Sequence, residues 1–173
     1  QPVRTVRPNQ LATRDDQLDQ RAFGADRSAL LDQLDRCSFT IATEYGFGMI
    51  RSGRRAAYLG PVTTETAQNA EPIIRALVGR TTGPVFWDIP GPNTLAHTLA
   101  ESLGFNPVRG LTRMTLGQMQ TEPDLMLQFA LAAPETVTGQ TFEVTTLAMS
   151  SDGLLAASAA GNSARTHGSS TMN

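Results

Sequence analysis

Hydrophobic residues along this chain follow two different spacings. Apolar residues that alternate with polar ones, or that form short apolar runs, predict strands over residues 3–7, 38–43, 47–51, 56–59, 84–89 and 108–116. Apolar residues that recur three, four and seven positions apart predict helices over residues 9–36, 70–78 and 93–103, the first of them divided in two by Gly24. The expected order is strand, two helices, three strands, helix, strand, helix, strand.

The ends of the expected helices carry residues that suit those positions. Asp26 is placed to cap the second helix with its carboxylate, and Asn93 is placed to cap the last one, which ends at Gly104. Proline lacks the backbone N–H that a helix interior needs, so Pro72 is expected in a first turn. This makes Asn69 the expected N-cap of the helix over residues 70–78.

The strands predict one sheet, followed by a polar tail. Three consecutive short strands joined by tight turns indicate an antiparallel meander, and the nearly all-apolar run 84–89 is typical of a central strand covered on both faces. Further on, residues 125–132 are expected to form a strand or a helix, and residues 142–149 have weak strand character. Ser, Ala, Gly and Asn dominate residues 150–173, which predicts a disordered tail.

Composition and charge exclude several classes of protein. The chain has 173 residues, 40% of them hydrophobic, and a formal net charge of −2, which predicts a domain with a real core and no nucleic-acid partner. A lone cysteine, Cys37, and two histidines far apart in the sequence predict neither a disulfide scaffold nor a metal site. No apolar run suits a membrane span and no signal peptide is visible, so a cytoplasmic protein is expected.

Several short motifs carry a resemblance to a known superfamily. Residues 93–105 present an Asn, two turns of helix and then Gly-Phe, and three separate short stretches, at residues 23–27, 58–62 and 113–114, add to the resemblance. Together with the element order, these motifs resemble the GNAT superfamily of N-acetyltransferases, most closely the smaller C-terminal GNAT-like domain of its two-domain members. The resemblance covers roughly residues 3–117.

The resemblance implies an α/β (α+β) fold with a mixed, mostly antiparallel sheet, helices on both faces, and strands that splay to admit acyl-CoA. It implies an acyl-CoA-binding domain over residues 1–117, a C-terminal extension over residues 118–149 that contributes a possible last strand, and the tail over residues 150–173. The implied cofactor is acetyl-CoA. The implied reaction is transfer of its acetyl group to an amine of a small molecule or peptide.

The same resemblance implies which residues bind the cofactor. In this family the main chain of the fourth strand holds the pantetheine arm, which points to Leu59, Gly60 and Val62 here. The main-chain N–H groups of Leu59 and Gly60 are also candidates to support the oxyanion that develops during acyl transfer. Asn93 is expected to lie near the CoA.

The loop that binds the pyrophosphate in this family differs in this chain. GNAT enzymes usually present Gln/Arg-x-x-Gly-x-Gly/Ala, because bare backbone N–H groups can approach the phosphates closely. The matching stretch, residues 63–69, has no Gly or Arg and carries the acidic Glu65. The hydroxyls of Thr63, Thr64 and Thr66 could bind phosphate oxygens, although Thr-rich turns also serve as simple caps.

Two side chains are candidates for catalysis. Asp88 ends an apolar strand, where a carboxylate is suited to accept a proton, and it is also suited to stabilise the turn that follows. Tyr58 could donate a proton or line the substrate cleft, while an aromatic residue on a middle strand is also an ordinary core residue. Ala100 occupies the position where catalytic members commonly carry the Tyr that reprotonates the CoA thiolate.

Three arginines, Arg51, Arg54 and Arg55, gather at one hairpin turn. Guanidinium groups bind oxyanions with two parallel hydrogen bonds, so these residues could hold an anionic substrate or the adenosine 3′-phosphate. Arginines at a hairpin tip also keep a sheet edge soluble, which is the simpler interpretation.

The alternative function is that of a non-catalytic domain. Ala100 and the glycine-free loop favour a GNAT-like accessory domain that completes the substrate cleft or the dimer interface of a catalytic domain. A ligand-sensing domain would fit the same sequence. The first residue is Gln1 and not Met, which indicates a processed chain or a fragment. The expected partner is an upstream GNAT domain or a second copy of the chain.

Overall fold

The computed structural model describes residues 4–5, 13–113, 121–132 and 142–149. Its helices are α1 (Thr13–Phe23), α2 (Ser28–Cys37), α3 (Ala67–Val78) and α4 (Thr94–Ser102), with a short 3₁₀ helix, η1 (Leu125–Leu127). Its strands are β1 (Arg4–Thr5), β2 (Ser38–Thr43), β3 (Gly46–Arg51), β4 (Ala57–Thr64), β5 (Val85–Pro90), β6 (Asn106–Arg113), β7 (Gln128–Ala130) and β8 (Phe142–Met149). The element order therefore matches the sequence-based expectation up to β6.

The strands form one sheet in the order β1-β2-β3-β4-β5-β8-β6, and β7 pairs with β4 off this path. Among the described strands, β4 and β5 are the only parallel pair, and every other pairing is antiparallel. The late segment 118–149 thus contributes β7 and β8 to the same sheet as the first part of the chain. The predicted mixed, mostly antiparallel sheet is confirmed.

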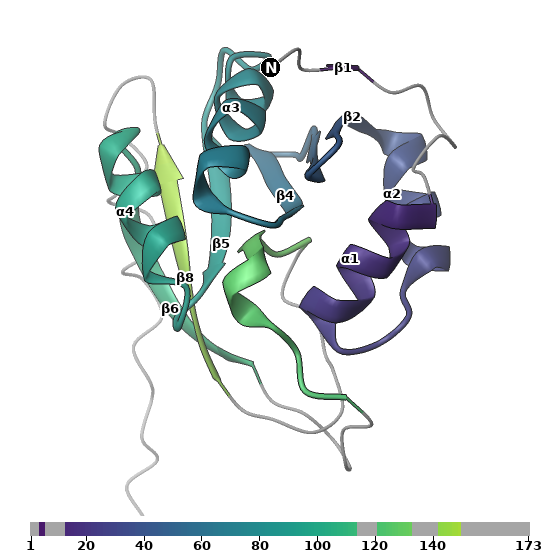
Figure 1. Ribbon diagram of the computed structural model, residues 1–173. Helices are drawn as coiled ribbons and strands as arrows, with labels where there is room; N and C mark the ends of the chain where they lie inside the picture. The colour runs from purple at the N-terminus through teal and green to yellow at the C-terminus, as the bar shows by residue number, and fades with distance from the viewer. Residues whose placement is uncertain (1–3, 6–12, 114–120, 133–141, 150–173) are drawn as a thin grey trace, which may run out of the picture.

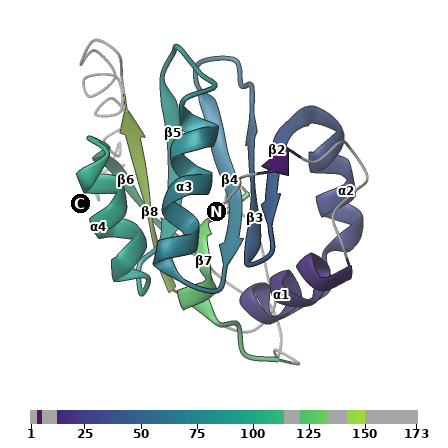
Figure 2. The same ribbon diagram turned by 45° about the horizontal axis from the view of Figure 1, so that its top comes forward.

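Helices cover the two faces of the sheet at different places (Figures 1 and 2). Ile73 of α3 packs in one core with Leu59 and Trp87 of the central strands, and α4 lies on this same face. Leu31 of α2 packs on the opposite face, against Phe47 of β3. Since α1 and α2 pack over β2, β3 and β4, the same face of β5, β8 and β6 carries no described helix (Figure 2).

The central strands diverge soon after they pair. β4 and β5 are in register only from Ala57 with Val85 to Leu59 with Trp87. Just beyond, β4 carries one residue more than β3, between the pairs Leu59 with Ile50 and Val62 with Gly48. Such a bulge bends a strand and increases its twist, so it moves the far half of β4 away from β5.

The capping predictions meet different outcomes. Asn93 caps α4, since its side chain accepts a hydrogen bond from the N–H of Ala96, and the carboxylate of Asp26 accepts one from the N–H of Ser28 at the start of α2. That backbone donor holds the pKa of Asp26 below its usual value. The prediction for Asn93 is confirmed, whereas the N-cap of α2 is Arg27, so the Asp26 carboxylate bonds the start of the helix from one position earlier.

The predicted start of α3 is wrong. The N-cap is Thr66 and not Asn69, so Pro72 lies inside the helix instead of in its first turn. Proline costs the helix one hydrogen bond, but Pro72 is on the exposed side of α3, where the freed carbonyl group remains accessible to solvent. The opposite side of α3 buries Ala70, Ile73, Ile74 and Leu77 completely, and this burial outweighs the loss.

A buried ion pair attaches α1 to the sheet. The carboxylate of Asp19 accepts two hydrogen bonds from the Arg27 guanidinium, at 2.6 and 2.8 Å, and one from the Thr63 hydroxyl of β4, at 3.0 Å. Asp19 is 1% exposed and Arg27 is 8% exposed. Removal of one member of a buried ion pair costs much more than the pair itself contributes, because the other charge stays buried.

We therefore predict that Asp19→Ala lowers the free energy of unfolding by about 3–5 kcal/mol, as measured by urea denaturation. The matched control is Glu71→Ala, which also deletes a carboxylate bonded to an arginine, Arg75, but in an exposed pair on α3. We expect the control to change the free energy of unfolding by about 0.5 kcal/mol or less. Equal losses in the two variants would contradict this account of how α1 is held.

Candidate functional site

β4 has a strand on each of its two edges. Val62 and Thr63 pair with β3 on one side and with Ala130 and Gln128 of β7 on the other. The edge that β5 leaves when it diverges is therefore taken by β7, which contacts both strands (Figure 2). Val62 is one of the residues whose main chain the resemblance assigned to the pantetheine arm, and the other two, Leu59 and Gly60, come just before it in β4.

The segment that follows η1, residues 128–132, is held there by hydrogen bonds from several elements. The indole N–H of Trp87 donates to the carbonyl of Phe129 at 2.7 Å, and the N–H of Leu131 donates to the carbonyl of Asp88 at 2.9 Å. Arg51 donates to the carbonyl of Ala132 and, at 2.9 Å, to that of Gly60. All five residues of the segment are at most 4% exposed, so it is part of the core.

Gly60 is the point of closest approach between β4 and this segment. It has φ +135°, and a Cβ atom built on it would lie 1.9 Å from the carbonyl oxygen of Leu131. Only glycine allows the two backbones to come this close in this conformation. The predicted cofactor residue Gly60 therefore faces the chain's own backbone.

Asn93 connects α4 to the same segment. Its side chain is fully buried, and its amide group donates to the carbonyls of Leu125, Met126 and Gln128 at 3.2, 3.2 and 2.9 Å. Since the amide oxygen caps α4, both ends of the side chain have protein partners. Its predicted position near CoA stays a prediction.

The predicted phosphate-binding hydroxyls have protein partners as well. Thr63 and Thr64 belong to the end of β4 and are fully buried. The Thr63 hydroxyl donates to Asp19, and the Thr64 hydroxyl donates to the carbonyl of Thr66 at 2.9 Å. The exposed Glu65 lies directly before the N-cap of α3, where a phosphate would have to approach.

The two candidate catalytic side chains share one face of the sheet. Tyr58 lies opposite Phe86 in the parallel register, with ring centroids 5.7 Å apart, and Asp88 is two residues further along β5. Because successive side chains alternate between faces, Phe86 and Asp88 both point away from α3 and α4. Tyr58 is half-buried and Asp88 is 5% exposed.

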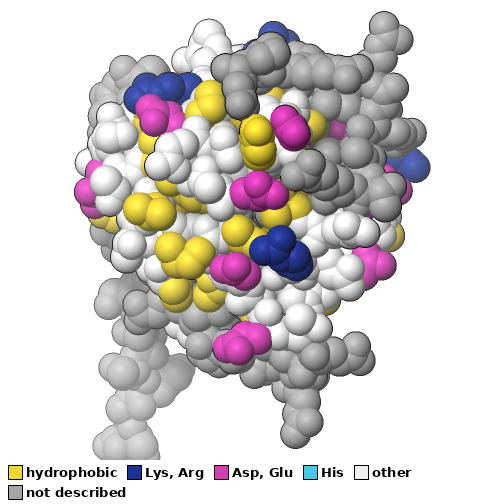
Figure 3. Space-filling view, viewed as in Figure 1, with side chains coloured by type: hydrophobic (Ala, Val, Ile, Leu, Met, Phe, Trp, Pro, Cys, Tyr) yellow, Lys and Arg dark blue, Asp and Glu magenta, His cyan; other side chains and the backbone are white. Residues whose placement is uncertain are grey.

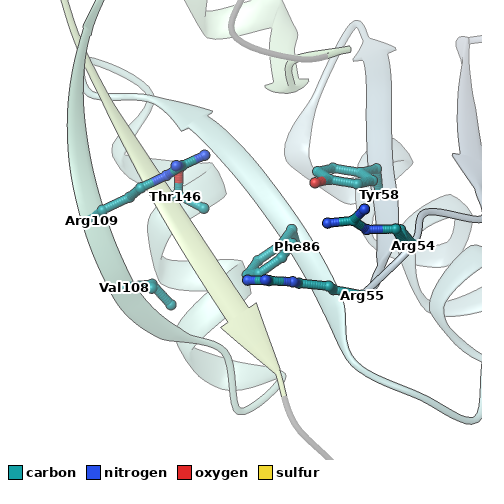
Figure 4. Close-up of a pocket in the computed structure, with 7 residues that line it drawn as sticks. All are labelled: Arg54, Arg55, Tyr58, Phe86, Val108, Arg109 and Thr146. Atoms are coloured by element: carbon teal, nitrogen blue, oxygen red, sulfur yellow. The ribbon is translucent and has the colours of Figure 1, made fainter. Parts of the chain in front are cut away.

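A pocket of about 370 Å³ opens on this face (Figure 4). Figure 4 shows Arg54 and Arg55 beside the two aromatic rings, with Arg109 and Thr146 across the pocket. The residues that line it come from the β3–β4 hairpin and from four strands: Arg54, Arg55, Tyr58, Phe86, Val108, Arg109 and Thr146.

One wall of the pocket is a chain of hydrogen bonds. The Thr146 hydroxyl donates to the Asp88 carboxylate at 2.5 Å and accepts from the Nε of Arg109 at 3.3 Å. Asp88 thus supports the pocket from beneath Thr146. The sequence missed Thr146 and Arg109, because β8 enters the sheet between β5 and β6 and only this register places the three residues side by side.

The described residues form neither a cluster suited to a metal ion nor a membrane-spanning helix. The part of the chain that the structure describes contains no group of three or more His, Cys, Asp and Glu side chains that could hold a metal ion. Within those same residues, no helix is long and apolar enough to cross a membrane. The cytoplasmic location expected from the sequence stays a prediction.

The order of the strands, the divergence of β4 from β5 and the helices on both faces define an acyltransferase-like α/β domain. The family model described as an acetyltransferase (GNAT) domain matches residues 16–130. The chain therefore belongs to the GNAT acetyltransferase family. The match ends inside the segment 128–132, so it includes β7.

Solved structures share the fold at low sequence identity. Arabidopsis thaliana NAA60 in complex with a bisubstrate analogue is 14% identical with a TM-score of 0.62, over 86% of this chain and 97% of that one. A Bacillus subtilis acetyltransferase in complex with CoA is 10% identical with a TM-score of 0.50, over 86% and 99%. A Pyrococcus horikoshii protein is 19% identical with a TM-score of 0.50, over 87% of this chain but only 40% of that one. No curated protein sequence matches the chain.

Acetyl-CoA, the cofactor that the family implies, does not fit the expected place in this chain. The edge of β4 is paired with β7, and the Thr63 and Thr64 hydroxyls are bonded within the protein. Ala100 is fully buried in the core against which α4 packs, so a tyrosine at this position would overpack it. No step of a reaction can therefore be assigned to acetyl-CoA at this edge.

The close contact between Gly60 and Leu131 predicts that a side chain at position 60 destabilises the fold. Gly60→Ala places a methyl group on a backbone carbonyl and imposes a strained φ, so we expect a loss of roughly 2–4 kcal/mol in the free energy of unfolding. The control, Gly83→Ala, makes the same change where a Cβ atom meets nothing within 4 Å, and should stay within about 0.5 kcal/mol of wild type. Unchanged stability of Gly60→Ala would mean that residues 128–132 do not occupy this position.

Proposed function

We propose that this chain is the accessory domain of a GNAT N-acetyltransferase. It contributes to transfer of an acetyl group to an amine by completing the acceptor site or the dimer interface of a catalytic GNAT domain, and it does not hold acetyl-CoA itself. The single observation that carries this proposal is that the chain itself occupies the edge of β4 that faces away from β3. β5 pairs with residues 57–59 of this edge and β7 pairs with residues 62–63.

The chemistry of acyl transfer supports the proposal. The reaction needs a donor for the developing oxyanion and a proton source for the leaving thiolate. The family takes the first from the main chain of β4 and commonly takes the second from a tyrosine on α4. In this chain the main chain of β4 is surrounded by residues of the protein's own core, and Ala100 stands where the tyrosine of α4 would be.

Two observations support a partner domain. The Pyrococcus horikoshii protein with the same fold is more than twice as long as the part that this chain covers, so such a fold occurs within larger proteins. Hydrophobic side chains gather over α4 and η1 (Figure 3), where Leu95 is 50% exposed and Met126 is 43% exposed. Exposed apolar side chains of this kind suit contact with another domain or a second copy of the chain.

A second candidate function is catalysis by the chain itself, as an acetyl-CoA-dependent N-acetyltransferase acting on a small-molecule or peptide amine. The observation that favours it is the placement of Tyr58 and Asp88 on one open face beside a pocket. In that case Asp88 would accept the proton of the amine, and Asp88→Asn would lower the rate of acetylation while leaving the KM for acetyl-CoA unchanged.

Isothermal titration with acetyl-CoA and with desulfo-CoA separates the two functions. The accessory role predicts no heat of binding up to millimolar ligand, because the main chain that would bind pantetheine is paired with β5 and β7 and lies against the segment 128–132. A catalytic GNAT domain titrated in the same buffer is the positive control. A dissociation constant below about 100 μM, or about 5–6 kcal/mol of binding free energy, would reject the accessory role and justify an amine screen.

A further inference from the structure

We propose that the pocket over β4, β5, β8 and β6 binds a small organic anion that has an aromatic or similarly planar body. The anionic group would lie between Arg54, Arg55 and Arg109, and the planar body would lie against Tyr58 and Phe86 (Figure 4). This inference does not rest on the proposed function, because the pocket is on the face opposite α3 and α4 and its test uses no coenzyme A.

The fold builds this pocket from a face that it leaves open. α1 and α2 cover β2, β3 and β4, and the neighbouring face of β5, β8 and β6 carries no described helix. The β3–β4 hairpin supplies Arg54 and Arg55 to the lining of the pocket. A Cβ atom on Gly53 would lie 2.4 Å from the carbonyl oxygen of Ala56 and 2.6 Å from the ring of Tyr58, so the hairpin lies directly against that ring.

The charge of the pocket is strongly positive for a chain whose net charge is −2. Three of its seven lining residues are arginines and none is acidic. Arg54 and Arg55 are exposed, and among the described residues neither is bonded to a carboxylate. The buried Asp88 beneath the pocket is bonded to Thr146, which in turn accepts a hydrogen bond from Arg109, so part of its charge is set against that arginine.

Protection of a sheet edge does not explain these arginines. β3 and β4 are interior strands, each with a neighbour on both sides, so the hairpin that joins them is not at an edge of the sheet. Arg51, the third arginine of the hairpin, is bonded to the carbonyls of Gly60 and Ala132 and supports the core. Arg54 and Arg55 remain, and both point to the pocket (Figure 4).

The lining selects the chemical class of the ligand. Guanidinium groups form paired, charge-assisted hydrogen bonds with carboxylate or phosphate oxygens. The rings of Tyr58 and Phe86, tilted at 44° to each other, and the half-buried Val108 offer apolar surface next to those charges. A volume of about 370 Å³ is at the small end of ligand pockets, which suits one ring with one anionic group.

Titration of the full chain with benzoate and with phenyl phosphate tests the inference, with benzyl alcohol as the neutral probe. We expect at least one of the two anions to bind with a dissociation constant of about 1 mM or tighter, and benzyl alcohol to bind at least about tenfold more weakly. The stronger of the two anions identifies the ligand group as carboxylate or phosphate. Weaker binding on going from about 50 to about 500 mM salt is also expected.

Two double variants locate the binding site. Arg54→Ala/Arg55→Ala should weaken binding of the anion at least about tenfold, and its unfolding curve should match wild type because both side chains are exposed. Arg36→Ala/Arg75→Ala removes the same charge from exposed positions on α2 and α3 and should bind like wild type. Absence of binding by both anions at about 10 mM, equal binding of benzyl alcohol, or equal loss in the two double variants would overturn the inference.

Discussion

Backbone pairing between β4 and β7 is the interaction on which the rest of this structure depends. The pairs Val62 with Ala130 and Thr63 with Gln128 join segments more than sixty residues apart in the chain. They exist because the bulge in β4 turns its far half away from β5 and leaves a row of backbone donors and acceptors that must find partners. The resemblance to GNAT enzymes places the cofactor along that row, and in this chain β7 pairs with Val62 and Thr63 of it.

The side chains around this pairing are organised to keep it. Trp87, Asn93 and Arg51 each donate to a backbone carbonyl of residues 128–132, and they come from β5, the start of α4 and the end of β3. A buried carbonyl without a partner is costly, so these donors make the arrangement stable as well as close-packed. The domain keeps the GNAT architecture. The main-chain groups of β4 that are expected to bind the cofactor contact residues of its own core instead. The open face of β5, β8 and β6 holds the pocket that we propose binds a small anion.

Local patterns predicted much of the fold. The meander β2-β3-β4, the helix capped by Asn93 and the apolar strand β5 all follow from spacing and caps, which act within a few residues. Pro72 misled the prediction because the burial of Ile73, Ile74 and Leu77 against the sheet outweighs one lost helical hydrogen bond. The short run Gln128–Ala130 could not be assigned, since three residues carry no period and its partner strand lies far away in the sequence. For the same reason, the sequence identified Arg54 and Arg55 as a cluster but did not identify Arg109 and Thr146. These two residues join the pocket only because β8 pairs between β5 and β6.

Hydrogen exchange of the backbone amides in residues 128–131 tests the central claim most directly. If these residues form the core strand that replaces the cofactor, the amide of Leu131, bonded to the carbonyl of Asp88, exchanges as slowly as the amides of β4 and β5. Addition of acetyl-CoA then leaves that rate unchanged. Fast exchange of these amides in the free protein, or a change in their exchange when acetyl-CoA is added, would contradict the account.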